Sequence, residues 1–265
     1  MDQAALKGKT AVVTGSATGI GAAVALGLAR SGVNVVVNYT KSVNEARHTA
    51  EAAEKLGAGV RVVQGDVARD ADCRAIAAAA MEAWGRIDIL VNNAGTTKFA
   101  GHADLDALSE EDFARLYRVN VIGAYQMVRA CLPGLKANGD GSVVNVSSIA
   151  GTYGIGSSIA YAASKGALNT MTKSLARALA PSVRVNAVCP GFVATRWFSD
   201  AFGKDNADRL AAEHKKLVPL DRVAEAEDIA RVVLFFAGRE SRHVTGELLL
   251  VDGGLHLTVA QAGFR

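Results

Sequence analysis

Short apolar runs alternate with longer amphipathic segments along the whole chain. Seven runs rich in valine and isoleucine predict strands at 10–14, 33–38, 60–64, 87–92, 142–147, 183–188 and 247–251. Alanine-rich segments at 20–30, 44–56, 70–84, 111–137, 160–180 and 227–237 predict helices. Because several of the strands are apolar at every position, we expect them to be covered on both faces.

This alternation predicts an α/β fold, with one doubly wound parallel sheet of about seven strands and helices on both faces. The length of 265 residues would allow one domain or two. No proline- or serine-rich linker, charge block or repeat divides residues 1–265, so we expect a single domain. The stretch 192–219 breaks the alternation and predicts a substrate lid, the alternative being an additional pair of surface helices.

Composition mainly excludes classes of protein. With 50% hydrophobic and 21% charged residues the chain is typical of globular proteins, and its scattered basic residues and net charge of +3 argue against a nucleic-acid partner. The distant Cys73, Cys131 and Cys189 predict free thiols in a reducing cytoplasm. We expect neither an export signal nor a membrane span. The five histidines lack paired ligand spacing, so we expect them at the surface or in helix caps, with no metal.

A glycine-rich turn follows the first predicted strand and leads into a helix, in the sequence Thr14-Gly15-Ser16-Ala17-Thr18-Gly19-Ile20-Gly21. Such a turn allows close backbone approach and offers the N–H groups of a helix N-terminus to a pyrophosphate, although it can also serve packing alone. Asp66 follows the third strand and Asn92-Asn93-Ala94-Gly95 the fourth. Since ligands of such sheets bind at the carboxyl ends of strands, the three segments together favour a nucleotide site.

A second group of residues points to proton transfer. Tyr161 and Lys165 are four residues apart at the start of a long predicted helix, so they share one face. An isolated pair of this kind would be an ordinary surface contact, but Ser148 lies just past the fifth strand and faces the same edge. Asn120 interrupts an apolar run, and a polar side chain buried there needs a partner.

The order and spacing of these motifs resemble the classical short-chain dehydrogenase/reductase family. The resemblance rests on TGSATGIG, NNAG, Asn120, Ser148, YAASK, Pro190-Gly191 and the closing Val251-Asp252-Gly253-Gly254, and it runs from about residue 8 to 254. It implies a single-domain Rossmann fold, a nicotinamide cofactor and reversible hydride transfer between carbonyl and alcohol. Members resembling 3-oxoacyl-carrier-protein reductases are the nearest in pattern.

The resemblance also implies catalytic roles. Tyr161 would be the general acid in reduction and the general base in oxidation, and Ser148 would hold the substrate oxygen. Lys165 would lower the pKa of Tyr161 and bond the nicotinamide ribose, and Asn120 would anchor a proton-relay water. Lowering a tyrosine pKa from about 10 to about 7 needs roughly 4 kcal/mol, which one cation at ~4 Å supplies at an effective dielectric constant of about 20.

The cofactor contacts implied by the resemblance come from the turns after successive strands. They are Gly15, Ser16, Thr18, Gly19, Ile20, Gly21, Asn38, Tyr39, Thr40, Lys41, Asp66, Val67, Asn93, Ala94, Gly95, Tyr161, Lys165, Pro190, Gly191, Val193 and Thr195. Arg196 and Trp197 come next and would start the lid, unless they are a surface cation and a packing aromatic.

The end of the second strand bears on the choice of nucleotide. A carboxylate at the position of Asn38 would bind the ribose hydroxyls and repel a 2′-phosphate, but Asn38 carries no charge. Lys41, with the Thr40 and Ser42 hydroxyls, offers a phosphate site, although Thr18 stands where the family often has an arginine. The sequence therefore favours NADP(H), with NAD(H) possible if Asn38 bonds the ribose.

Substrate and assembly are less defined. Aromatic residues of 192–219 beside Arg196, Lys204, Lys215 and Lys216 would fit 3-oxoacyl thioesters, and the same pattern fits sugar, steroid and small-ketone reductases. The alternative, which the charge pattern favours, is that these basic residues form a solvated helix face. A non-catalytic nicotinamide-dinucleotide sensor or scaffold is the alternative function, although such a module need not retain the four catalytic residues. The family implies a homotetramer (or homodimer), and the tail 255–265 would reach a neighbouring subunit.

Overall fold

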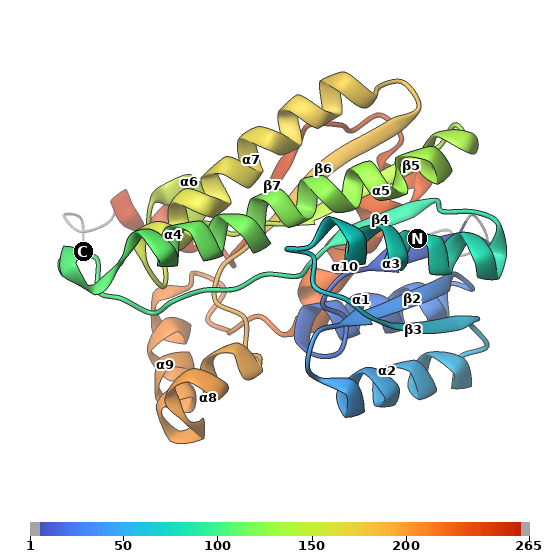
Figure 1. The fold of residues 1–265 in the computed structure, drawn as a ribbon. Coiled ribbons are helices and arrows are strands. Elements are labelled where there is room, and N and C mark those ends of the chain that lie inside the picture. The colour runs from blue at the N-terminus through green and yellow to red at the C-terminus, as the bar shows by residue number, and fades with distance from the viewer. Residues whose placement is uncertain (1–5, 261–265) are drawn as a thin grey trace.

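A seven-stranded parallel sheet forms the centre of the computed structural model, which describes residues 6–260 (Figure 1). The strands are β1 (Thr10–Val13), β2 (Asn34–Tyr39), β3 (Val60–Gln64), β4 (Ile89–Asn92), β5 (Gly141–Val146), β6 (Val183–Pro190) and β7 (Leu248–Val251). Their order in the sheet is β3-β2-β1-β4-β5-β6-β7. All seven predicted strands are confirmed to within two residues at each end. The chain reverses its direction of winding between β1 and β4, where open α/β sheets bind their ligands.

Helices cover both faces of the sheet. Helices α1 (Gly19–Arg30), α2 (Val43–Lys55) and α10 (Ala226–Ala237) bury one set of strand side chains, and α3 (Asp70–Trp84), α5 (Ala124–Ala137) and α7 (Ile159–Leu179) bury the other. The two sets alternate along each strand, so Val13 and Val91 face the first cluster while Val12 and Leu90 face the second. The continuous apolar runs are therefore explained by burial on both sides.

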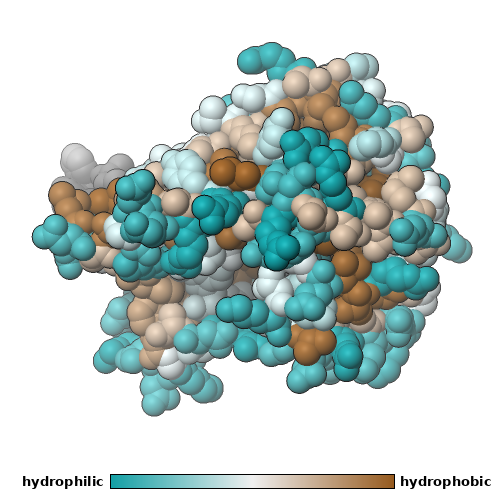
Figure 2. All heavy atoms as spheres, in the orientation of Figure 1, coloured by the Kyte–Doolittle hydropathy of each residue, from teal (hydrophilic) through white to brown (hydrophobic). Residues whose placement is uncertain are grey.

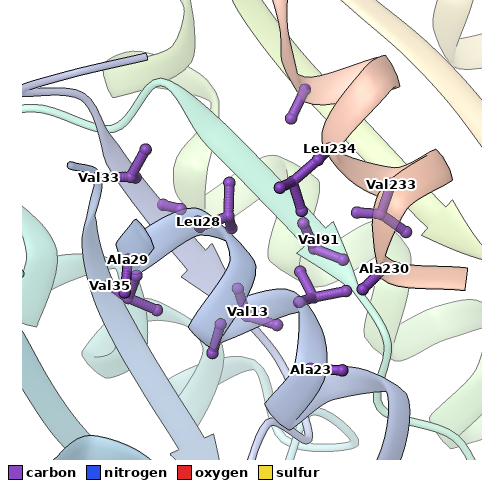
Figure 3. Close-up of a cluster of buried hydrophobic side chains, with 14 of the residues drawn as sticks. Val13, Ala23, Leu28, Ala29, Val33, Val35, Val91, Ala230, Val233 and Leu234 are labelled. Carbon is purple, nitrogen blue, oxygen red and sulfur yellow. The ribbon is translucent and has the colours of Figure 1, made fainter. Parts of the chain in front are cut away.

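Close packing against α10 fixes the position of α1 on the sheet. Figure 3 shows Leu28 of α1 and Leu234 of α10 in one cluster with Val13 and Val91 of the strands. A Cβ added at Gly27 would lie 3.2 Å from both terminal methyl carbons of Leu234, so the two helices approach at van der Waals distance. Such packing resists displacement of the helix.

The structure differs from the sequence prediction in two segments. The helix expected at 111–137 is three pieces: α4 (Glu110–Tyr117), a π-helical segment Arg118–Gly123, and α5. The stretch 192–219 contains α8 (Arg196–Phe202) and α9 (Lys204–Leu217), at the lower left of Figure 1. We call α8 and α9 with their flanking residues the lid segment. It is thus a helix pair, and residues of both helices line the principal cavity.

The remaining elements are short. They are α6 (Ala150–Tyr153) and the 3-10 turns Leu105–Ala107, Arg239–Ser241 and Leu255–Ala260. Cys73, Cys131 and Cys189 are buried free thiols. Within residues 6–260 no helix has the length and apolar character needed to cross a membrane. Of the tail 255–265, residues 261–265 lie outside the described residues.

Candidate active site

A cavity of about 1080 Å³ opens at the carboxyl ends of the strands, between the sheet and the lid segment. Figure 2 shows the surface hollowed between the lid segment, at the lower left, and the α2 side, at the lower right. Most of the expected cofactor residues line this cavity: Gly15, Thr18, Gly19, Ile20, Asn38, Thr40, Lys41, Asp66, Val67, Asn93, Ala94, Gly95, Tyr161, Lys165, Pro190, Gly191, Val193 and Thr195. Ser148 lines it as well.

The glycine-rich turn fits a pyrophosphate. Gly15 has a φ of +60°, and a Cβ there would lie 2.9 Å from the Cα of Ala94, so only glycine lets the turns after β1 and β4 meet. Within the described chain, no side chain caps the N-terminus of α1 and its first turn holds no acidic residue. Its free N–H groups and partial positive charge are therefore available to an anion.

Asn93 fastens the two turns together. Its Nδ2 donates to the carbonyl oxygens of Thr14, at 3.0 Å, and Gly15, at 2.9 Å. In return the Thr14 hydroxyl accepts from the backbone N–H groups of Asn93 and Ala94, both at 3.0 Å. The floor of the cavity is thus set by side chains before any ligand binds.

Asn38 is buried and its amide is used within the protein. Oδ1 accepts from the N–H of Gly15 at 3.1 Å, and Nδ2 donates to the carbonyls of Val63, at 3.3 Å, and Gly65, at 3.0 Å. These partners set the orientation of the amide and occupy both of its N–H groups. Asn38 therefore joins the turns after β1, β2 and β3, and it has no amide N–H left for a ribose.

Four expected site residues, all within the described chain, stand outside the cavity wall. The buried Ser16 hydroxyl donates to Val13 O at 2.7 Å and accepts from Asn38 N at 3.0 Å, which ties β1 to β2. A Cβ at Gly21 would overlap the Gly15 carbonyl, so that glycine serves the close turn. Tyr39 pairs with β3, and Asn120 is buried behind the turn after β4.

The catalytic candidates meet at the start of α7. Ser158 caps this helix by accepting from the N–H of Tyr161 at 3.2 Å, and the Ser148 hydroxyl is hydrogen-bonded to that of Tyr161. Lys165 is almost fully buried; its Nζ donates to Val146 O at 2.8 Å and lies 5.7 Å from the centre of the Tyr161 ring. The i, i+4 spacing thus does place the tyrosine and the lysine on one face.

Burial controls the charges of this pair. Desolvation raises the pKa of Tyr161 to about 12, with the Ser148 hydrogen bond acting in the opposite direction. Desolvation also lowers the pKa of Lys165 to about 8. A lowered tyrosine pKa was expected from the sequence, and the structure shows the opposite direction. The Lys165 ammonium lies 5.7 Å from the ring centre and bonds the Val146 carbonyl, and removal of water from the phenol sets the direction of the Tyr161 pKa shift.

Asn120 holds the π-helical segment to its neighbours. Its Oδ1 accepts from Thr96 N at 2.8 Å, and its Nδ2 donates to Thr96 O and to Ser164 Oγ, both at 3.0 Å. Ser164 Oγ in turn donates to the carbonyl of Tyr161 at 2.7 Å. The Asn120 amide is therefore a positioning group, since both of its N–H groups are bonded within the protein.

An aromatic wall, formed by Phe99, Phe192, Phe198, Phe202 and His214, encloses the outer part of the cavity. Phe192 stacks on Phe198, with ring centres 4.3 Å apart, and on His214 at 4.5 Å, while Phe99 meets Phe202 edge-on at 4.5 Å. Burial lowers the pKa of His214, which keeps this wall uncharged at neutral pH. Thus His214 is not the surface or capping residue that the sequence predicts.

Sequence reasoning missed Phe99, Arg115 and His214 as cavity residues. Phe99 follows the Asn93-Ala94-Gly95 turn by four residues, which is the one signal that could have placed it near the strand edge. Four basic residues were candidates for the rim of this cavity. Arg196 lines it, and within residues 6–260 Lys204, Lys215 and Lys216 are not among the lining residues. Trp197 also lines it, with its ring centre 6.4 Å from that of Tyr161.

Known proteins are similar to this chain over most of its length. The family model described as enoyl-(acyl carrier protein) reductase matches residues 15–256. A Streptomyces violaceoruber protein named as ketoacyl reductase 2 of the granaticin polyketide synthase is 45% identical over 250 residues, covering 93% of this chain and 96% of its own. The chain belongs to the short-chain dehydrogenase/reductase family. This short-chain dehydrogenase/reductase is an oxidoreductase that acts on CH–OH and C=O groups with NAD(P).

Other relatives of this short-chain dehydrogenase/reductase differ in named substrate. The 3-oxoacyl-(acyl-carrier-protein) reductase of Thermotoga maritima is 36% identical, covering 94% of this chain and 98% of its own. The L-rhamnose 1-dehydrogenase of a Sphingomonas strain is 37% identical, covering 96% and 98%. Among solved structures, the ligand-free aldohexose dehydrogenase of Thermoplasma acidophilum has a TM-score of 0.84 at 28% identity, with 96% of each chain covered.

Proposed function

We propose that this enzyme is an NADPH-dependent ketoreductase in which Tyr161 is the general acid. The observation that carries the proposal is the buried cluster of Tyr161, its hydroxyl partner Ser148 and the nearby ammonium of Lys165, at the wall of one cavity. A buried tyrosine with a raised pKa retains its proton at neutral pH, as an acid must.

The proton and the hydride go to different atoms of the carbonyl. When bound, NADPH supplies the hydride that adds to the carbonyl carbon. The Ser148 hydroxyl holds the carbonyl oxygen, and Tyr161 gives that oxygen its proton as the alcohol forms. The Lys165 ammonium stabilises the phenolate left on Tyr161 until solvent returns a proton, and Asn120 keeps the start of α7 in register through Ser164.

The end of β2 supports NADPH over NADH. Lys41 and Thr40 line the cavity, and the segment from Asn38 to Lys41 carries no carboxylate that would repel a 2′-phosphate. Use of NAD(H) through Asn38 is the weaker alternative, because a neutral amide oxygen that already accepts from Gly15 N is a poorer acceptor for ribose hydroxyls than a carboxylate. The uncharged Asn38 thus supports the preference for NADPH.

The aromatic wall favours an apolar carbonyl substrate. Offset and edge-on ring contacts between Phe99, Phe192, Phe198 and Phe202 offer flat apolar surfaces rather than hydrogen bonds. A 3-oxoacyl thioester or a ketone of comparable apolar bulk fits such a wall better than a sugar. The names of the Streptomyces and Thermotoga relatives agree with this choice, whereas that of the rhamnose dehydrogenase favours a sugar.

A substrate panel tests the activity. NADPH and NADH oxidation would be followed with the N-acetylcysteamine thioester of acetoacetate, an aryl ketone and a small aliphatic ketone, and NADP⁺ reduction with L-rhamnose. We expect NADPH-dependent reduction of the thioester or the aryl ketone. Binding of NADPH without turnover of any carbonyl would favour the non-catalytic sensor, and a clear kcat/KM advantage with NADH would refute the nucleotide preference.

We also propose a homotetramer, or a homodimer, as the active form. Phe113, Ile122 and Tyr125 on α4, the π-helical segment and α5 are exposed by 36%, 49% and 47%, which a neighbouring subunit would cover. A monomeric mass by light scattering at micromolar concentration would refute this assembly.

A further inference from the structure

A cation of the lid segment lies beside the glycine-rich turn. A Cβ added at Gly19 would be 3.6 Å from two carbons of the Thr195 side chain, so the lid segment begins in contact with the turn. Arg196, the next residue, lines the principal cavity and also a smaller neighbouring cavity whose wall includes Thr18 and Glu45. Position 18 is a threonine, and Arg196 of the lid segment lines the same smaller cavity as Thr18.

The present partner of Arg196 is a carboxylate on α2. Its Nη1 donates to Glu45 Oε1 at 2.7 Å, and its Nε lies 3.5 Å from Asp200 Oδ2. Both sides of the first pair are solvent-accessible, with 52% of the Arg196 side chain and 38% of the Glu45 side chain exposed. Exposed ion pairs of this kind contribute little to stability, so the guanidinium can exchange partners at small cost.

The ion pair spans the region between the glycine-rich turn and the start of α2. Lys41, two residues before α2 begins, lines the same principal cavity, and the interval from Asn38 to Ser42 contains no carboxylate. Arg196 contacts Glu45 in the first turn of α2, four residues after Lys41, so its guanidinium lies beside the turn between β2 and α2. A phosphate with nearly two charges is a stronger partner for a guanidinium than one carboxylate is.

We propose that Arg196 is a specificity-determining residue that binds the 2′-phosphate of NADPH by exchanging Glu45 for it. When no phosphate is present, Glu45 holds the Arg196 guanidinium at the wall of the principal cavity. When a phosphate binds, Glu45 competes with it for the guanidinium. The inference rests on the proposed use of NADPH. It accounts for how a turn with threonine at position 18 recognises a 2′-phosphate.

Calorimetric binding of 2′,5′-ADP and 5′-AMP tests this role without turnover. For Arg196→Gln we expect about 10-fold or greater loss of 2′,5′-ADP affinity, because one charge-assisted contact is removed, and less than about 2-fold change for 5′-AMP. Arg196→Lys should retain part of the affinity, and Glu45→Gln should tighten 2′,5′-ADP several-fold by freeing the guanidinium. Arg209→Gln, an arginine of α9 that bonds Asn206, is the matched control and should match the wild type.

The outcomes separate the two proposals. A wild-type protein that binds both ligands equally would refute the NADPH preference and this role together. If the wild type prefers 2′,5′-ADP but Arg196→Gln leaves that preference intact, or weakens both ligands equally, the role of Arg196 is wrong and the NADPH preference stands. Glu45→Gln keeps the test valid even if Arg196→Gln fails to fold, since weaker 2′,5′-ADP binding in that variant contradicts the competition.

Discussion

Helix α7 and the lid segment face each other across one cavity, and they are built differently. Nine residues of α7 are buried, Lys165 among them, whereas α8 and α9 have no buried residue in the described structure. Lys165 of α7 is bonded to β5 and Ser164 to Asn120 of the π-helical segment, which is itself bonded to Thr96 after β4. The lid segment is held by ring contacts and by the exposed Arg196–Glu45 pair.

On the proposed function, the difference separates proton transfer near α7 from substrate recognition by the lid segment. Proton transfer requires heavy atoms placed to within a fraction of an ångström, which a buried, hydrogen-bonded network provides. Recognition of varied substrates tolerates an adaptable wall, and a segment with few buried contacts opens at low free-energy cost. We therefore expect substitutions near α7 to lower kcat or stability, and substitutions in the lid segment to change KM with little effect on either.

The largest effect is expected at Tyr161. Tyr161→Phe keeps the ring and removes the transferable proton, so kcat for reduction should fall by about 10³-fold, within the range of general acid catalysis. NADPH affinity and Tm should remain close to those of the wild type. Tyr153→Phe, on the neighbouring α6 with its side chain 40% exposed, is the matched control and should keep full activity. Undiminished kcat in Tyr161→Phe would remove this residue from the mechanism.

Asn120 tests whether the buried network supports α7. Asn120→Leu leaves the backbone groups of Thr96 without their partners, so the free energy of unfolding should fall by about 2–4 kcal/mol. For a chain of this length that corresponds to a Tm lower by roughly 5–15 °C, measured by calorimetry, together with a reduced kcat. Asn206→Leu, whose amide bonds Phe202 O at the surface of the lid segment, should change Tm by about 2 °C or less. Equal losses in both variants would contradict the comparison.

The pH dependence reports on Lys165. Reduction needs a protonated pair, and the first proton to leave it comes from Lys165, whose pKa is about 8. The kcat/KM for reduction should therefore be level below pH 8 and fall above it, approaching about tenfold per pH unit. Oxidation should rise with pH over the same interval. Lys173→Met, at an exposed position of α7, should leave the profile unchanged; a profile level to pH 10 would show that the Lys165 ammonium is not required.

Much of the fold follows from local pattern, because strands buried on both faces are apolar throughout and helices between them are amphipathic. The interruption of the helix at Asn120 does not, since the hydrogen bonds that Asn120 makes there reach Thr96, twenty-four residues earlier. A π-helical segment has no strong composition signal of its own. The prediction of a lowered pKa for Tyr161 is wrong for a related reason. Desolvation of the phenol depends on the packing around Tyr161 rather than on the spacing to Lys165.

The candidate site also contains residues that the sequence predicts and residues that only the fold brings together. Residues in turns after strands, such as Gly15, Asn93 and Ser148, were located because the carboxyl ends of parallel strands meet at one edge. The aromatic wall was only partly found, since Phe99 and Phe202 are far apart in sequence and meet through the fold. Whether a residue such as Asn38 binds the ligand or the protein depends on its partners in space, which the sequence does not encode locally.

The smallest effect is expected within the aromatic wall. Phe192→Leu keeps apolar volume and loses the stacked contacts with Phe198 and His214, each worth about 0.5–1.5 kcal/mol. The KM for an aryl ketone should rise by roughly fivefold with kcat and Tm nearly unchanged, since the lid segment has little buried structure to lose. Leu217→Ala, an exposed residue at the end of α9, should leave KM unaltered. A lower kcat in Phe192→Leu at unchanged KM would mean that the wall positions the reacting carbonyl, and the division between rigid chemistry and adaptable recognition would then fail.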